Sequence, residues 1–364
     1  MATKPLATKA SCDAVWRHEA IAGERPASRR SDTEEATASG RHWLTRRRLL
    51  IAGLQLVVLL ISAGVIVGLL HKVNPGQVIQ KSGHVSWSLV WLAIGINIPV
   101  SALRAWRSQF LVNRFGYRVP WPRMAGTQLA GQTLSWLTPA AAGDLVRPYM
   151  WRNRDGVPVS SGVAAVLYER LVTVFQMGVI GGCLAAAVFL PGLAVAGLSA
   201  AALAMLFAPW WISLATRRAH RIETVDGRRG LMAGALRAAV RLQDLGLSFR
   251  VAVVFTALTL GVFLLSGFQI LLLAWGVGAG LALWVAVSAY CLSQVAGSVS
   301  TLPFGLGATD VVVISLLTAA GLGAVSAAAV TILLRLATTL PLGIAGALGI
   351  LILGRPRIPI DGDA

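Results

Sequence analysis

Several acidic and basic residues lie within or beside apolar segments, and their side chains could bind a ligand or take part in chemistry. They are Asp144, Arg147, Glu169, Arg170, Asp310 and Arg335. An arginine in the middle of a membrane span costs about 2.5–3.5 kcal/mol on insertion scales, so we expect it to face protein or water. Arg170 could pair with Asp144, and Arg335 could pair with Asp310. Alternatively, the guanidinium groups could hold the oxygens of a phosphate. The sequence leaves both functions open.

Simpler roles remain for some of these residues. Asp144 and Asp310 each precede an apolar helical run, and aspartate is a good N-cap residue, so both could cap helices. Arg147 could bind a ligand near the irregular segment at about 124–150. It could equally be a positively charged residue at the cytoplasmic interface.

Other residue types offer little for catalysis. The five histidines lie in polar tails or in connections, and the three cysteines are far apart without metal-ligand spacing. No phosphate-binding loop, nucleophile elbow or dinucleotide-binding glycine motif occurs in a suitable setting. We therefore expect that the chain is not an enzyme and that it needs no cofactor and no metal.

The composition indicates a polytopic membrane protein. The chain has 364 residues, of which 56% are hydrophobic and 13% are charged, and the mean hydropathy is +0.70. A single soluble core could not bury so much apolar surface, whereas lipid can solvate it. The net charge of +17 lies mostly between apolar runs, which favours membrane orientation over nucleic-acid binding.

Apolar runs predict an all-α fold with about six full transmembrane helices. We place them at 49–70, 87–110, 160–190, 192–215, 251–275 and 325–352. Two less regular segments, near 124–150 and 283–323, are predicted to be re-entrant helix hairpins. The transmembrane domain would cover 45–355, between a disordered cytoplasmic tail at 1–44 and a second cytoplasmic tail at 356–364.

Lys and Arg are abundant in alternate connections and scarce in the others. This alternation predicts that both termini are cytoplasmic and that the protein spans the inner membrane several times.

The two irregular segments indicate an inverted repeat with halves at about 45–190 and 192–352. Each has a hydroxyl residue followed by Pro, Gly and Asp, with Pro139 in the first and Pro303 in the second. The spans starting near Trp87 and Val251 share the offset of these prolines, and Arg170 and Arg335 follow it to within one residue. The predicted orientation makes the two copies enter the membrane from opposite sides. Coincidence among Pro and Gly in an apolar chain is the alternative.

Helix breaks inside the bilayer would give these segments a binding role. Pro139 and Gly143 in the first hairpin, and Pro303, Gly305 and Gly307 in the second, are helix breakers. Broken backbone is tolerated at membrane depth only where it packs in protein or lines a wet cavity. The helix that starts after each break would present free N–H groups to an anion.

Four motifs carry a resemblance to a known family: LTPAAAGDLVRPYMWR, LYERLV, LPFGLGATD and LLRLATTLP. In order and spacing they resemble the transmembrane region of lysylphosphatidylglycerol synthases, a group of flippase-like membrane proteins, over about residues 45–355. The resemblance implies movement of a polar lipid between leaflets. The family commonly has Pro-Gly-Gly-Leu-Gly followed by glutamate in the second hairpin, whereas this chain has Phe304 in place of a glycine and Asp310 near the acid position.

The resemblance does not extend to the soluble aminoacyl-transferase domain of the synthases, so we do not expect synthase activity. Membrane lipids, most of all anionic ones, are the expected partners. The alternative is a non-catalytic membrane subunit that anchors or regulates a lipid-modifying or glycosyl-transferring enzyme. A third reading is an intramembrane transferase that acts on a lipid-linked sugar.

Overall fold

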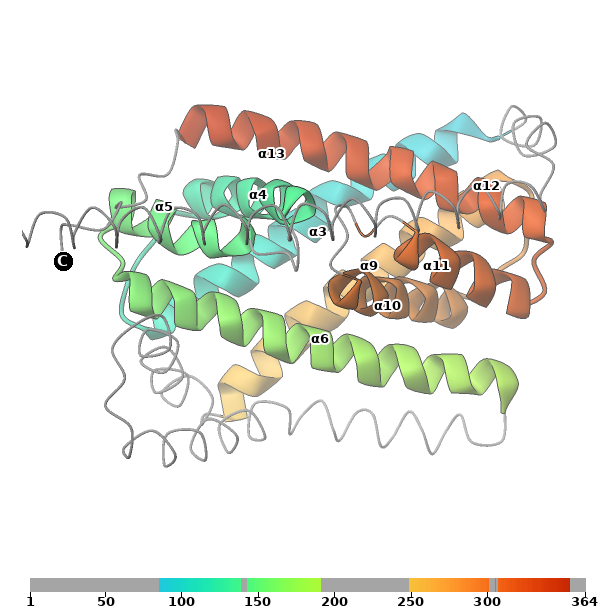
Figure 1. Ribbon diagram of the computed structural model, residues 1–364, viewed down its shortest axis with the longest axis horizontal. Coiled ribbons are helices and arrows are strands. Elements are labelled where there is room, and N and C mark those ends of the chain that lie inside the picture. The colour runs from blue at the N-terminus through green and yellow to red at the C-terminus, as the bar shows by residue number, and fades with distance from the viewer. Residues whose placement is uncertain (1–84, 139–142, 191–248, 301–304, 306, 354–364) are drawn as a thin grey trace, which may run out of the picture. The chain divides into compact units, whose positions relative to one another are not determined.

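The computed structural model describes residues 85–138, 143–190, 249–300, 305 and 307–353, all within the compact unit Val57–Ala364. These residues form helices and no strand (Figure 1). The predicted tails, the predicted spans at 49–70 and 192–215, and both Pro139 and Pro303 lie outside the described residues.

The helices occur in the same order twice along the chain. The first series is α3 (Trp87–Arg114), α4 (Trp121–Leu137), α5 (Val146–Asp155) and α6 (Val159–Phe189). The second series is α9 (Phe249–Gly276), α10 (Leu283–Val299), α11 (Ala308–Ala319), α12 (Ala324–Leu334), a π-helical turn η4 (Arg335–Thr339) and α13 (Leu340–Leu353). In both series a helix of 28 residues is followed by one of 17 and then by a short one of 10 or 12.

Four helices in the described part are long and apolar enough to cross a membrane: Trp87–Arg114, Val159–Val188, Arg250–Gly276 and Ala324–Ile352, the last of which joins α12, η4 and α13. They correspond to four of the predicted spans. Large apolar side chains on them are exposed, such as Ile98 at 75% and Leu351 at 77%. Large apolar side chains exposed along helices of this length are what lipid as a solvent favours.

Helices α3 and α9 pack against each other in opposite directions (Figure 1). At one end, the backbone N–H of Ser86 donates to the carbonyl of Gly276 over 3.1 Å. Toward the other end, the guanidinium Nη1 of Arg107 donates to Thr259 Oγ1 over 3.1 Å. The antiparallel pair therefore links the first helix of one series to the first helix of the other.

The 17-residue helices pack across the two series. Helix α4 lies on α13, and α10 lies on α6 (Figure 1). Hydroxyl groups join both contacts, because Thr133 Oγ1 donates to the Leu342 carbonyl over 3.4 Å and Ser288 Oγ donates to the Gly181 carbonyl over 2.9 Å. A Cβ at Gly346 would overlap Thr133, so this glycine permits the close approach of α4 and α13.

The glycines of the two predicted hairpins serve different physical purposes. Gly305 and Gly307 adopt φ of 60° and 82°, which side chains disfavour, so these two residues turn the chain into α11 as predicted. Gly143 does not have a positive φ. Instead, a Cβ on Gly143 would overlap the backbone of Leu134 and Ser135, so the absence of a side chain lets the chain fold back onto the end of α4.

Candidate functional site

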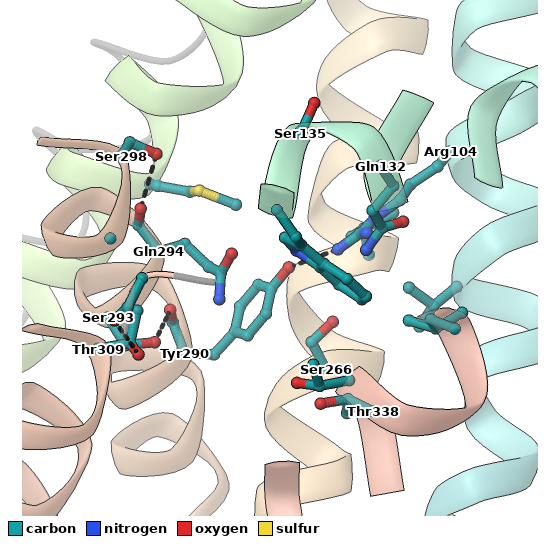
Figure 2. Close-up of a pocket in the computed structure, with 18 of the residues that line it drawn as sticks. Arg104, Gln132, Ser135, Ser266, Tyr290, Ser293, Gln294, Ser298, Thr309 and Thr338 are labelled. Atoms are coloured by element: carbon teal, nitrogen blue, oxygen red, sulfur yellow. Dashed lines mark hydrogen bonds between the residues drawn. The ribbon is translucent and has the colours of Figure 1, made fainter. Parts of the chain in front are cut away.

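A cavity of about 270 Å³ lies among the helices, and all of them except α5 contribute lining side chains (Figure 2). Its lining includes charged groups from α3, α6 and η4, together with many amides and hydroxyls. The predicted site residues that line it are Asp144, Glu169, Arg170, Gly305, Asp310 and Arg335. Gly143, Arg147 and Gly307 are not lining residues, but each contacts one that is. Gly143 packs against Ser135, Arg147 donates to Glu169, and the Gly307 amide donates to Asp310.

The ion pair predicted between Asp144 and Arg170 is confirmed. Arg170 Nε donates to Asp144 Oδ2 over 2.8 Å, and Arg170 Nη2 bonds to the same oxygen. Asp144 makes no side-chain cap, since α5 begins at Val146 with Leu145 as its N-cap residue. The capping role considered for Asp144 is therefore wrong, and the carboxylate neutralises an arginine instead.

The ion pair predicted between Asp310 and Arg335 is also confirmed. Here the ion pair and the helix-capping role considered for Asp310 occur together. Arg335 Nε donates to Asp310 Oδ1 over 2.9 Å. The second oxygen, Oδ2, accepts the backbone N–H of Gly307 over 3.1 Å. Asp310 thus satisfies an amide at the N-terminus of α11 while it neutralises Arg335, and it occupies an amide that was predicted to be free for an anion.

Glu169 is the centre of a buried cluster. Its Oε1 accepts from Arg107 Nη2 over 2.7 Å, and its Oε2 accepts from Ser108 Oγ over 2.8 Å and from Arg147 Nη2 over 3.3 Å. Glu169 and Arg107 are each 5% exposed, and Arg147 is 1% exposed. Two arginines and one glutamate leave this cluster with a formal charge of +1.

Neighbouring aromatic rings help the protein to tolerate this charge. The guanidinium carbon of Arg107 lies 5.1 Å from the ring centroid of Phe255, and that of Arg147 lies 5.1 Å from that of Trp151. Such cation–π contacts contribute about 2 kcal/mol or more when desolvated. Arg147 does not project into solvent, because its side chain is buried against Glu169 and Trp151.

Arg104 is a lining residue that the sequence analysis did not single out; it lies within the predicted span 87–110. It lies on α3, one helical turn before Arg107, and its Nη2 donates to the Tyr290 hydroxyl of α10 over 2.9 Å (Figure 2). Among the described residues no carboxylate forms an ion pair with Arg104. Its charge therefore remains available to the cavity.

Neutral polar groups complete the lining. Asn97 Nδ2 donates to the carbonyl of Ala337 in η4 over 2.6 Å, and Gln269 Nε2 donates to Asn97 Oδ1 over 3.0 Å. Buried polar atoms without a hydrogen-bond partner in the described part of the structure include Gln132 Oε1, Asp144 Oδ1 and Thr173 Oγ1. These three residues all line the cavity, although the three atoms themselves are covered by neighbouring protein atoms.

Potential metal-binding side chains of the described segments are dispersed. Within them no group of three or more His, Cys, Asp or Glu side chains gathers in a way that could hold a metal ion. The carboxylates of the cavity are instead engaged by arginines.

Residues 55–346 match the family model for the lysylphosphatidylglycerol synthase transmembrane region. The chain belongs to this family. It is also 34% identical over 154 residues to the glycosyltransferase AglD from Haloferax volcanii, a match that covers 42% of this chain and 23% of the relative. The matched region is thus less than a quarter of the length of that relative.

Proposed function

We propose that this protein binds an anionic or phosphate-bearing lipid headgroup in the cavity and moves it between the leaflets of the inner membrane. The observation that carries the proposal is the charge of the lining. Four arginines, Arg104, Arg107, Arg170 and Arg335, face three carboxylates, Asp144, Glu169 and Asp310. Membrane lipids, above all anionic ones, are then the ligands.

Each of these carboxylates is already neutralised by an arginine, whereas Arg104 bonds to a neutral hydroxyl. An uncompensated cation in a partly desolvated cavity favours an anionic ligand, and a guanidinium matches phosphate oxygens well. The cavity volume of about 270 Å³ suits a headgroup and excludes a whole lipid. The acyl tails would remain in the hydrocarbon.

An inverted repeat with six full spans and two re-entrant hairpins would give such a protein two alternating entrances. The repeated helix order, the antiparallel α3–α9 pair and the reciprocal packing of α4 on α13 and α10 on α6 support it. The two Asp–Arg pairs support it as well, because they are buried to similar degrees. Their arginines are 34% and 28% exposed, and their aspartates are 13% and 14% exposed. Both termini would be cytoplasmic.

Movement without catalysis fits the chemistry of the lining, so we propose that the protein is not an enzyme. The carboxylates serve as partners of arginines, and the sequence has no nucleotide-binding motif. The headgroup would move down its gradient or with an ion.

Headgroup accessibility in proteoliposomes tests this proposal. Vesicles that contain a tail-labelled anionic lipid are treated with a membrane-impermeant quencher, with and without the purified protein. We expect the protein to raise the quenchable fraction above the outer-leaflet share, and Arg104→Ala to abolish the increase. A fraction that the wild-type protein leaves unchanged would overturn the proposal.

The second candidate is a membrane subunit that anchors or regulates a glycosyl-transferring or lipid-modifying enzyme, and the similarity to the glycosyltransferase AglD favours it. It differs from the first in its readout. Under this candidate, Arg170→Ala disrupts a partner complex while the distribution of lipids stays the same with or without the protein.

A further inference from the structure

We infer that the cavity selects a phosphate-bearing headgroup rich in hydroxyl groups, of the sugar or polyol type, over both a bare phosphate and a cationic aminoacylated headgroup. The inference rests on the proposed function, because it names the class of headgroup that the same cavity would take. Three features carry it: the positions of the carboxylates, the position of Arg104, and the neutral polar side chains around them.

The carboxylates leave no place for a cationic group. Glu169 is shared by Arg107 and Arg147, Asp310 is held by Arg335 and the Gly307 amide, and Asp144 is held by Arg170. An ammonium that approached the unused Asp144 Oδ1 would lie beside the Arg170 guanidinium and would be repelled. A lysyl or other amine-bearing headgroup therefore fits this lining poorly.

Arg104 provides the position for the phosphate. Its guanidinium extends from α3 toward α10 and, among the described residues, makes one hydrogen bond, to the Tyr290 hydroxyl. An arginine has five N–H donors in a planar fork, so it can keep this bond and still bind two phosphate oxygens. In Figure 2, Arg104 and Tyr290 meet inside the cavity, and Gln132 and Gln294 also line this space.

The neutral polar lining points to a ligand with hydroxyl groups. Gln132, Gln294 and Ser266 place amides and a hydroxyl on the cavity wall, and an amide oxygen there accepts a hydrogen bond that a fully deprotonated phosphate cannot donate. A sugar or polyol hydroxyl donates and accepts at once, so it can pair with an amide, a carboxylate oxygen or the Thr173 hydroxyl. Buried polar groups left unpaired are costly, which turns this pairing into selectivity.

Binding measured by native mass spectrometry tests the inference. The purified full-length protein is stripped of lipid and titrated with phosphatidylinositol, phosphatidic acid and lysyl-phosphatidylglycerol that carry the same acyl chains. We expect phosphatidylinositol to bind about tenfold more tightly than phosphatidic acid, the equivalent of one or two added hydrogen bonds. The cationic lipid should bind most weakly of the three.

Two substitutions at one position separate the hydroxyl contribution from the charge contribution. Gln132→Leu removes the amide and should reduce the ratio of phosphatidylinositol binding to phosphatidic acid binding from about tenfold to about one. Gln132→Glu adds a carboxylate and should shift the preference toward the cationic lipid. Elution as a single species in gel filtration establishes that each variant is folded.

The results distinguish the two proposals. Equal binding of phosphatidylinositol and phosphatidic acid, both weakened by Arg104→Ala, would overturn the headgroup class and leave the proposed function standing. If Arg104→Ala leaves the binding of every lipid unchanged, both proposals are overturned. Tightest binding of the cationic lipid, which also bears a phosphate, to the wild-type protein would overturn the headgroup class and leave the proposed function standing.

Discussion

Asp310 of α11 and Arg335 of η4 form an ion pair across the intervening helix α12 of the chain, with Arg335 Nε donating to Asp310 Oδ1 over 2.9 Å. The arginine is the first residue of the π-helical turn η4, and the aspartate holds the Gly307 amide through its other oxygen. One carboxylate therefore connects the start of α11 to a local widening of the Ala324–Ile352 helix. Such π-helical turns occur frequently at functional sites.

Asp310→Asn tests the energetic role of this pair. The substitution removes the charge of a partly buried partner, so we expect lower stability, by about 1–3 kcal/mol, in thermal or denaturant unfolding in detergent. In a double-mutant cycle with Arg335→Gln the coupling energy should be about 0.5–3 kcal/mol. Additive effects of the two substitutions would show that the pair contributes no coupling.

Glu169→Gln should be the most destabilising single change of charge. It leaves Arg107 and Arg147 buried next to each other without a counter-ion, and breaking a buried pair costs about 3–5 kcal/mol. Asp155→Asn is the control: the Asp155 side chain is 5% exposed, but its partner Arg123 is 46% exposed and stays solvated when the pair is broken, so the loss of stability should be smaller. Equal losses of unfolding free energy in the two variants would contradict the role of the buried cluster.

Gly143→Ala should severely impair folding. The added methyl group would overlap the backbone of Leu134 and Ser135, which cannot move independently of α4. Gly178→Ala is the control, since nothing lies within 4 Å of its added Cβ and alanine is the better helix former by about 0.5–1 kcal/mol. Yield of folded protein and unfolding temperature are the measurements. A fully folded Gly143→Ala variant with unchanged stability would argue against the close turn.

Asn97→Leu should weaken the π-helical turn. Asn97 supplies a hydrogen bond to the Ala337 carbonyl, and the substitution leaves that buried acceptor and the Gln269 amide without this partner. An unsatisfied buried polar group costs about 1–3 kcal/mol. Hydrogen exchange of the amides in 335–342 should become faster in the variant. Exchange that stays as slow as in the wild-type protein would show that the turn does not depend on Asn97.

Much of the helical architecture follows from hydropathy and charge. Long apolar runs predicted the four spanning helices that the structure describes, because lipid leaves few alternatives to a helix of this length. The pairs Asp144–Arg170 and Asp310–Arg335 were predictable for a related reason. An arginine deep in a span needs a counter-ion, and few carboxylates are available at that depth.

Arg104 and Arg107 show where this reasoning stops. Both lie near the end of an apolar run, where the preference for positive charge on the cytoplasmic side explains an arginine as well as a binding role does. Hydropathy gives the length of a span but not the rotation of the helix about its axis. That rotation directs these two side chains inward, toward Tyr290 and Glu169. The spacing of one helical turn between them was the available signal.

Photo-crosslinking at two adjacent residues tests most directly whether a headgroup enters the cavity. Val174 lines the cavity, whereas Phe175, next to it on α6, is 42% exposed on the outside. A photoreactive amino acid is introduced at each position in turn, and the lipids captured in native membranes are identified by mass spectrometry. We expect position 174 to capture anionic lipids through their headgroups, and position 175 to capture acyl chains in proportion to the bulk membrane. The same lipids and the same attachment at both positions, or no lipid at 174, would contradict passage of a headgroup through the cavity.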